Sequence, residues 1–93
     1  MKKIIILPSF ERSVKRLSAH DKKRLAANLE QFNAFLISGK APFGFRLKKI
    51  NHDKYEFRVG IKQRVIIKMA DEAIYLVLIG THDEIKRHLR HFK

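Results

Sequence analysis

The spacing of apolar residues changes from the period of a helix to that of a strand after Ala41-Pro42, and this change does most to limit the possible folds. Before it, apolar side chains recur at intervals of three and four residues, which is the period of an amphipathic helix. After it, apolar and polar side chains alternate, which is the period of a strand with one buried face. Helices followed by a run of strands are typical of an α+β domain.

The part before Pro42 predicts a short strand over residues 1–7 and then a helical hairpin. The expected boundaries are Pro8 closing the strand, Ser9 and Asp21 capping the two helices, Ser18 to His20 joining them, and Gly39 ending the second. The predicted apolar stripes are Phe10, Val14 and Leu17 in the first helix, and Leu25, Leu29, Phe32 and Leu36, widened by Ala26 and Phe35, in the second.

The part after Pro42 predicts four antiparallel strands and a final helix. The last strand, Ala73 to Ile79, is continuously apolar, as expected of a strand covered on both faces, and the tight turn Asp71-Glu72 precedes it. The three earlier strands are indicated by Phe43 with Phe45 to Leu47, by Tyr55, Phe57 and Val59, and by Val65, Ile67 and Met69.

The final helix is predicted from Thr81 and Glu84, which have the spacing of a capping box, and from the apolar stripe Ile85, Leu89 and Phe92. The expected architecture is thus a single α+β domain over residues 1–93, in the order β-α-α-β-β-β-β-α. It consists of an N-terminal strand, a helical hairpin, an antiparallel four-strand meander and a C-terminal helix.

The chain carries 21 lysines and arginines against nine acidic residues, a formal net charge of +12. Such an excess repels itself in a folded protein and is typical of a polyanionic partner. The chain has no cysteine, and the five histidines lack a metal-binding spacing, so no metal or other cofactor is expected. The apolar run before Pro8 is too short for a signal peptide or a membrane span, so a cytoplasmic protein is expected.

Alternation along two strands predicts a charged face on the sheet. If Tyr55, Phe57 and Val59 face the core, the residues between them face the other way, and the same holds for the next strand. Opposed residues of an antiparallel pair share a face, which requires a loop with an odd number of residues, or a bulge, near Gly60. The predicted face carries Glu56, Arg58, Arg64 and Lys68, with Lys48 and Lys49 close by. The alternative is an ordinary solvated face with a cross-strand ion pair.

Three segments resemble the RelE/ParE superfamily of bacterial and archaeal toxins, and the resemblance extends from Ile4 to Phe92. They are Tyr55-Glu56-Phe57-Arg58-Val59-Gly60, Arg64-Val65-Ile66-Ile67, and Ile79-Gly80-Thr81-His82-Asp83-Glu84-Ile85. The sequence departs from the family pattern at Glu56, where RelE-type members have a lysine, and after His82, which no aromatic residue follows. Phe92 corresponds to the near-terminal aromatic residue of several members.

The resemblance to RelE-like members implies a toxin that cleaves messenger RNA at the ribosome and is neutralised by a cognate antitoxin. The implied catalytic residues are Arg64 and Arg58 holding phosphate, Glu56 as general base and His82 as general acid. Attack by the 2′-hydroxyl of the RNA would need no metal or small-molecule cofactor. The lysines expected to bind the RNA backbone are Lys48, Lys49, Lys68 and Lys86.

Two alternatives remain open at this point. ParE-like members share the fold and inhibit DNA gyrase without cleaving nucleic acid, and an inactive member would only bind RNA. The pair Glu56 and His82 favours the nuclease, because a purely basic face would lack acid and base groups. The expected partners are an antitoxin with an acidic binding segment and mRNA on the ribosome, with no membrane involved.

Overall fold

The computed structural model describes residues 3–40 and 47–91. Its elements are β1 (Lys3–Ile6), α1 (Pro8–Lys15), α2 (Ala19–Ser38), β2 (Lys48–Asn51), β3 (Lys54–Val59), β4 (Gln63–Met69), β5 (Ala73–Gly80) and α3 (His82–His91). This order confirms the predicted β-α-α-β-β-β-β-α sequence and the α+β class. The residues 43–46 used to predict the second strand, and Phe92 of the last stripe, lie outside the described residues.

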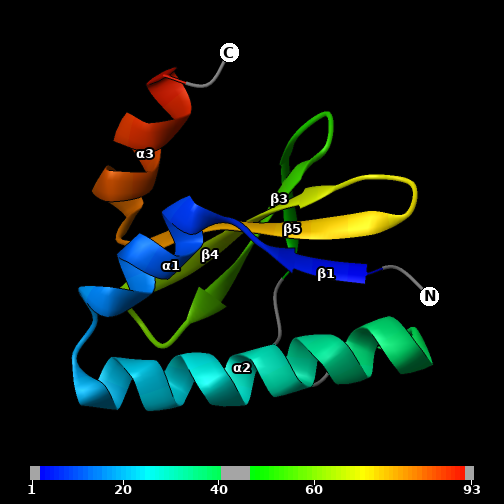
Figure 1. The fold of residues 1–93 in the computed structure, drawn as a ribbon, viewed down its shortest axis with the longest axis horizontal. Helices are drawn as coiled ribbons and strands as arrows, with labels where there is room; N and C mark the ends of the chain where they lie inside the picture. The colour runs from blue at the N-terminus through cyan, green and yellow to red at the C-terminus, as the bar shows by residue number, and fades with distance from the viewer. Residues whose placement is uncertain (1–2, 41–46, 92–93) are drawn as a thin grey trace.

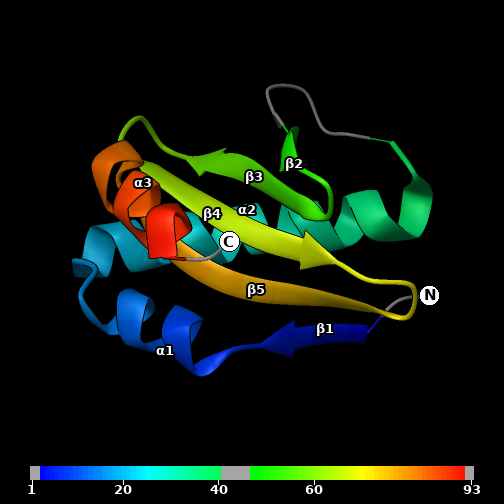
Figure 2. The same ribbon diagram turned by 90° about the horizontal axis from the view of Figure 1, so that it is seen from above.

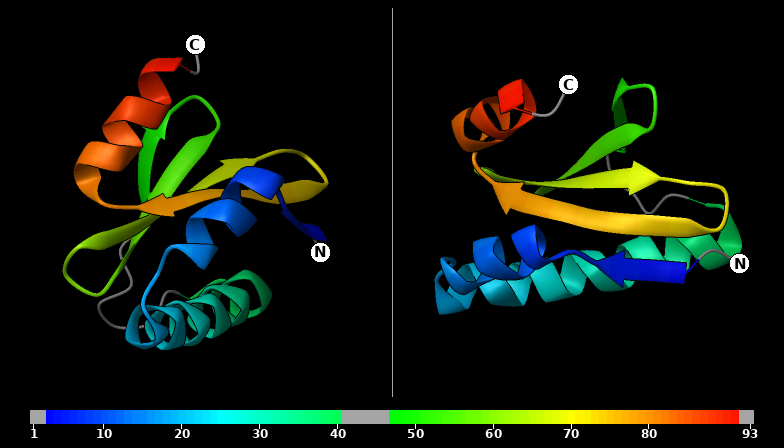
Figure 3. Two further views of the ribbon diagram at one scale, coloured as in Figure 1. Left: turned by 60° about the vertical axis from the view of Figure 1, so that its left-hand side comes forward. Right: turned by 45° about the horizontal axis from the view of Figure 1, so that its top comes forward.

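The five strands form one sheet in the order β1-β5-β4-β3-β2, so β4 is the central strand. Strands β2 to β5 form the predicted antiparallel meander, and β1 joins it parallel to β5. Helix α2 runs below the sheet and α3 stands above it (Figure 1). Viewed from above, α3 lies over β4 and β5 (Figure 2). The β2–β3 hairpin rises on the same side as α3 (Figure 3, right).

Two apolar clusters hold these layers together. The larger lies between the sheet and the helices α1 and α2, and includes Phe32 and Phe57, whose stacked rings have centroids 5.2 Å apart. Tyr55 packs against this cluster, so it faces the core, as its alternation with Glu56 and Arg58 indicates. The smaller cluster joins the other face of the sheet to α3 through Ile66, Val77, Leu78 and Ile85. Strand β5 is therefore covered on both faces, as predicted.

Helix α1 takes the place of β1 beside the second half of β5. The β1–β5 pairing ends at Ile6 and Leu76, where Val77 forms a bulge in β5. Beyond that point the hydroxyl of Ser9 donates to the carbonyl of Val77 at 2.6 Å, and the N–H of Ile79 donates to Ser13 Oγ at 3.0 Å. Two serines on successive turns of α1 thus satisfy backbone groups that a neighbouring strand would otherwise pair.

Two of the predicted helix caps are wrong. Helix α2 is capped by Ser18, whose Oγ accepts from the N–H of Asp21 at 3.1 Å, so Asp21 belongs to the first turn. Helix α1 begins at Pro8 with Leu7 in the N-cap position, because proline suits the first helical position. Ala26 is exposed and does not widen the apolar face of α2. Gly39 ends α2 as predicted, with a φ of 74°.

The turn between β3 and β4 has the predicted odd length. Arg58 pairs with Arg64 and Val59 with Gln63, which leaves the three residues 60–62 in the loop. Gly60 has a φ of 67°, a conformation that residues with a Cβ rarely adopt. The residues of β3 and β4 that alternate with the core residues therefore share one face of the sheet.

The turn at Asp71-Glu72 and the capping box at Thr81 are also confirmed. The N–H of Ala70 donates to the carbonyl of Ala73 at 2.8 Å, closing the turn between β4 and β5. Thr81 N–H donates to Glu84 Oε1 at 2.9 Å, and Glu84 N–H donates to Thr81 Oγ1 at 3.3 Å. Among the described residues, no helix is long and apolar enough to cross a membrane.

Candidate functional site

Arg64 lies between an acidic and an imidazole side chain on the face of the sheet that bears α3. Its Nη1 is 3.4 Å from Glu56 Oε2 and 3.0 Å from His82 Nδ1. The Arg64 and Glu56 side chains are only 22% and 14% exposed, whereas His82 is exposed. Three residues that are distant in sequence thus meet in one chain of contacts, Glu56–Arg64–His82.

Strand register brings these residues together. On β4, Arg64 lies opposite Arg58 of β3 on one side and Gly80 of β5 on the other. His82 follows Gly80 by two residues and opens α3, so the end of β5 carries its imidazole over the sheet toward Arg64. The reciprocal bonds of the capping box at Thr81 determine where α3 starts and hence where His82 lies.

Both neighbours of Arg64 act as hydrogen-bond acceptors toward its guanidinium group. A guanidinium group can only donate hydrogen bonds, so His82 Nδ1 must be the acceptor. The Glu56 carboxylate accepts from the same guanidinium nitrogen, as its ionised form does well.

A pocket on this face gathers most of the predicted catalytic residues. It is lined by Lys48, Glu56, Arg58 and Arg64, so that one carboxylate lies among three cations. Lys48 reaches it because it lies opposite Glu56 in the β2–β3 pair. Such a pocket offers charge-assisted donors to an anion and places a carboxylate beside it, which suits a phosphate group next to a hydroxyl.

Lys49 does not belong to this face. It lies opposite Tyr55, whose side chain packs against the larger core cluster, so Lys49 is on the side of α1 and α2. The expectation that Lys48 and Lys49 both flank the charged face is wrong for Lys49. Adjacent residues of a strand point to opposite faces, and this rule could have excluded one of the two.

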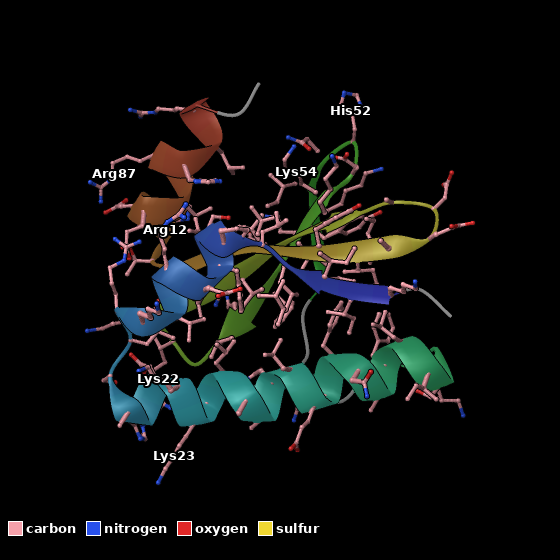
Figure 4. All side chains as sticks on the ribbon, in the orientation of Figure 1. Arg12, Lys22, Lys23, His52, Lys54 and Arg87 are labelled. Atoms are coloured by element: carbon pink, nitrogen blue, oxygen red, sulfur yellow. The ribbon has the colours of Figure 1, made fainter. Side chains whose placement is uncertain are left out.

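The remaining lysines extend the charged face away from Arg64. Lys68 is on the same face, four residues along β4, which corresponds to about 13 Å at the rise of a strand. Lys54 lies opposite Lys68, on the upper side of the sheet (Figure 4), and was missed although it has the parity of Glu56 and Arg58. Asp53 lies 3.6 Å from the Lys54 ammonium and 3.9 Å from that of Lys68. Lys86 is exposed on α3, one turn after His82.

Glu84 stabilises the start of α3, beside the site. The hydrogen bond from the Thr81 N–H holds the pKa of Glu84 below its ordinary value of 4.5, and the charges of Arg16 and Arg87 act in the same direction. Burial works against this shift. The carboxylate is thus committed to the start of α3. Across residues 3–40 and 47–91, no group of three histidine, cysteine or acidic side chains is arranged to hold a metal ion.

No family model matches the chain, and no curated protein matches its sequence. Solved structures match its fold. RelE in the RelB–RelE antitoxin–toxin complex of Methanococcus jannaschii superposes with a TM-score of 0.68 at 20% identity, over 88% of this chain and 94% of that one. The chain has the fold of the RelE-type toxins.

Two further toxins superpose almost as well. YafQ of E. coli has a TM-score of 0.65 at 17% identity, over 91% of this chain and 98% of that one. YoeB of Staphylococcus aureus, solved as a dimer, has a TM-score of 0.66 at 18% identity, over 87% and 97%. The RelE-like architecture expected from the three sequence segments is therefore present over nearly the whole length of these proteins.

Proposed function

We propose that this protein is the toxin of a toxin–antitoxin pair and cleaves messenger RNA on the ribosome. The observation that carries the proposal is the contact chain Glu56–Arg64–His82, which brings a carboxylate, a guanidinium and an imidazole together on one open face. The shared fold supports it, since RelE in the superposed complex is the toxin partner of an antitoxin.

The reaction uses the nucleophile that RNA itself carries. Glu56 removes the proton of a 2′-hydroxyl, whose oxygen attacks the adjacent phosphorus. The bond from phosphorus to the 5′-oxygen breaks as His82 delivers a proton to that oxygen. The products are a 2′,3′-cyclic phosphate and a 5′-hydroxyl, so atoms and protons balance. A carboxylate, an imidazole and guanidinium groups suffice for these steps.

Arg64 must change partners for this to happen. Without substrate its Nη1 is shared by Glu56 and His82. A phosphate carries a full negative charge on geometrically matched oxygens, so it competes well for the guanidinium. When Arg64 turns to the phosphate, Nδ1 of His82 becomes available for protonation and Glu56 is released to act as a base. Arg58, exposed and opposite Arg64, would hold the same phosphate.

The lysines on the same face would attract the RNA backbone. Lys48, Lys54 and Lys68 share the sheet face with Arg64, and Lys86 extends the charge along α3. Lys49, on the other face, could reach RNA only around the β2 edge of the sheet. An antitoxin that covers this basic face would need an acidic segment.

The carboxylate and imidazole beside Arg64 favour cleavage over the ParE-like inhibition of gyrase, which requires neither. Single-turnover cleavage of mRNA on programmed ribosomes, paired with a gyrase supercoiling assay, distinguishes the two functions. Cleavage by the wild type with no effect on supercoiling is the expected result. Supercoiling inhibition without cleavage would replace the proposal with the ParE-like function, and RNA binding with neither activity would indicate an inactive member.

In the same assay, Glu56→Gln and His82→Ala should each lower the cleavage rate by roughly 10²–10⁴-fold, the range for a lost general base or acid. RNA affinity should change little, because the net charge of +12 supplies most of the attraction. Glu30→Gln and His20→Ala, at exposed positions of α2, are the matched controls and should retain the wild-type rate. Unchanged rates in the first two variants would remove these residues from the mechanism.

A further inference from the structure

A second hollow opens on the same face, between α3 and the sheet. Ile66 and Val77 form its floor, Leu89 of α3 and Leu7 form its walls, and Lys54 and Lys68 stand at its rim. Its volume is about 160 Å³. One water in the liquid occupies about 30 Å³, so the hollow has room for a planar ring.

The hollow is continuous with the cleavage site. Ile66 lies between Arg64 and Lys68 along β4, and alternation puts the three side chains on one face of the sheet. An RNA strand that places a phosphate on Arg64 and follows β4 therefore passes over it. Lys68 is about 13 Å from Arg64 along the strand, taking about 3.3 Å per residue. The floor of the hollow at Ile66 is about 7 Å from Arg64 at the same rise per residue. A stacked nucleic-acid strand advances about 3.4 Å per nucleotide, and an extended one roughly twice that, so the hollow is about one to four nucleotides from the scissile phosphate.

The chemistry of the lining suits a nucleobase. An apolar floor accepts the flat face of a base, and two opposed ammonium groups at one end of the rim are placed to hold a neighbouring phosphate. Ser9 also lines the hollow, and its hydroxyl proton is already donated to Val77. Toward a ligand Ser9 can therefore only accept, which fits the N–H groups on the edge of a base.

We propose that this hollow binds one unstacked base of the RNA, one to four nucleotides from the cut. The inference rests on the proposed function, because it takes the position of the strand from the phosphate on Arg64. It adds a subsite to that function, in which recognition of a base away from the scissile bond contributes to the choice of cleavage position.

The test is an abasic scan. A set of mRNAs, each with a single abasic nucleotide at one position around the cleavage site, is cleaved in single turnover on programmed ribosomes. An abasic nucleotide at one position, one to four nucleotides from the cut, should lower the rate by roughly tenfold, since stacking of one base on a protein contributes about 1–3 kcal/mol. The penalty at a position is the cleavage rate of the intact RNA divided by that of the RNA that is abasic there. In Leu89→Ala the penalty at the responsive position should fall toward one, while the penalties at other positions stay as in the wild type.

A second variant and a second measurement keep the proposal testable if Leu89→Ala is unstable or if cleavage fails. Lys54→Ala changes only the rim and should halve the penalty or more, whereas Lys22→Ala, on α2 below the sheet (Figure 4), should not. The equilibrium affinity of the protein for each of the same abasic RNAs shows whether the hollow binds a base, and this measurement does not require cleavage. A positional penalty in binding with no cleavage overturns the proposed function and keeps the subsite.

A flat scan in both assays overturns the subsite and leaves the proposed function intact. A penalty that is identical in wild type and Leu89→Ala also overturns the subsite. If the scan is flat while Leu89→Ala weakens the capture of a co-expressed antitoxin, the hollow takes an apolar side chain of that protein instead, and the proposal of a base is wrong.

Discussion

At the scale of single residues, the alternation of apolar and polar residues along a strand correctly predicted which side chains share the charged face of the sheet. Closeness in sequence, which grouped Lys49 with Lys48, did not. Glu56, Arg58, Arg64 and Lys68 share a face because apolar residues alternate with them along β3 and β4. Strand β2 offers no such alternation, and its lysines fall on opposite faces. The contact of Arg64 with His82 could not be predicted from periodicity, since it depends on how β5 ends and where α3 begins.

Arg64 contacts both Glu56 and His82, so the proposed mechanism depends on the shape of its guanidinium group as well as on its charge. Arg64→Lys keeps the charge but replaces a planar fork by a single ammonium, which cannot make the same parallel bonds to a phosphate. The cleavage rate should fall by roughly 10²-fold or more, the scale of losing one aimed donor in a transition state. The thermal midpoint should change little in this variant, because lysine keeps a cation beside the partly buried Glu56 carboxylate.

Single-turnover cleavage and thermal unfolding of Arg64→Lys and Arg64→Ala check this prediction. Arg24→Lys, at an exposed position of α2, is the control. If both Arg64 variants lose stability steeply while cleavage per folded molecule is unchanged, Arg64 is a structural residue and the site must be assigned elsewhere.

At the scale of elements, hydrophobic period located the helices and strands but did not locate all of their ends. Ser18 and Asp21 are both good N-cap residues, and only the backbone geometry shows that Ser18 takes the position. The replacement of β1 by α1 along β5 was not predictable either, because Ser9 and Ser13 look like ordinary helix residues in the sequence. The capping box of α3 was predictable, since its two residues interact locally.

That capping box should give the stability of the protein a defined pH dependence. The folded pKa of Glu84 is lowered, so its contribution is fully present above the unfolded pKa near 4.5 and is lost as the pH falls through the folded value. At neutral pH, Glu84→Gln should lower the free energy of unfolding by up to about 1 kcal/mol, the scale of a helix cap. As the pH falls below about 4.5 the difference from wild type should shrink.

Chemical denaturation of the two proteins at a series of pH values between neutral and strongly acidic measures this difference. Glu30→Gln, exposed in the middle of α2, controls for the loss of one carboxylate. A difference between wild type and Glu84→Gln that stays constant across the acidic range would show that the charge of Glu84 does not stabilise α3.

At the scale of the whole molecule, composition predicted a polyanionic partner without saying where it binds, and the fold divides the charge between two faces. Lys48 and Lys49 test this division, because they are neighbours in sequence on opposite sides of the sheet. The parallel pairing of β1 with β5 also depends on the whole fold, because it joins residues that are about 70 positions apart in the sequence. The apolar pattern of residues 4–7 indicates a strand but does not specify its partner.

Lys48→Ala should reduce the steepness of the salt dependence of RNA binding by close to one released counterion, and Lys49→Ala by much less. For a single-stranded RNA, the slope of log K against log salt should become shallower by about 0.7 in the first variant. Fluorescence titrations of a short RNA at several salt concentrations give both slopes. Equal changes in the two variants would mean that RNA does not distinguish the faces of the sheet.

The parallel pairing of β1 with β5 also sets the order in which the chain can be completed during synthesis. β1 comprises residues 3–6 and its partner β5 residues 73–80, so β1 has no neighbouring strand until β5 has left the ribosome. Until then Ile4, Ile5 and Ile6, which stay partly exposed even in the finished fold, have no sheet to join. His82 follows β5 directly, so the contact chain with Arg64 and Glu56 is completed only with the final helix. A nascent copy of this chain therefore cannot assemble its site until His82 and the helix that it opens have left the ribosome.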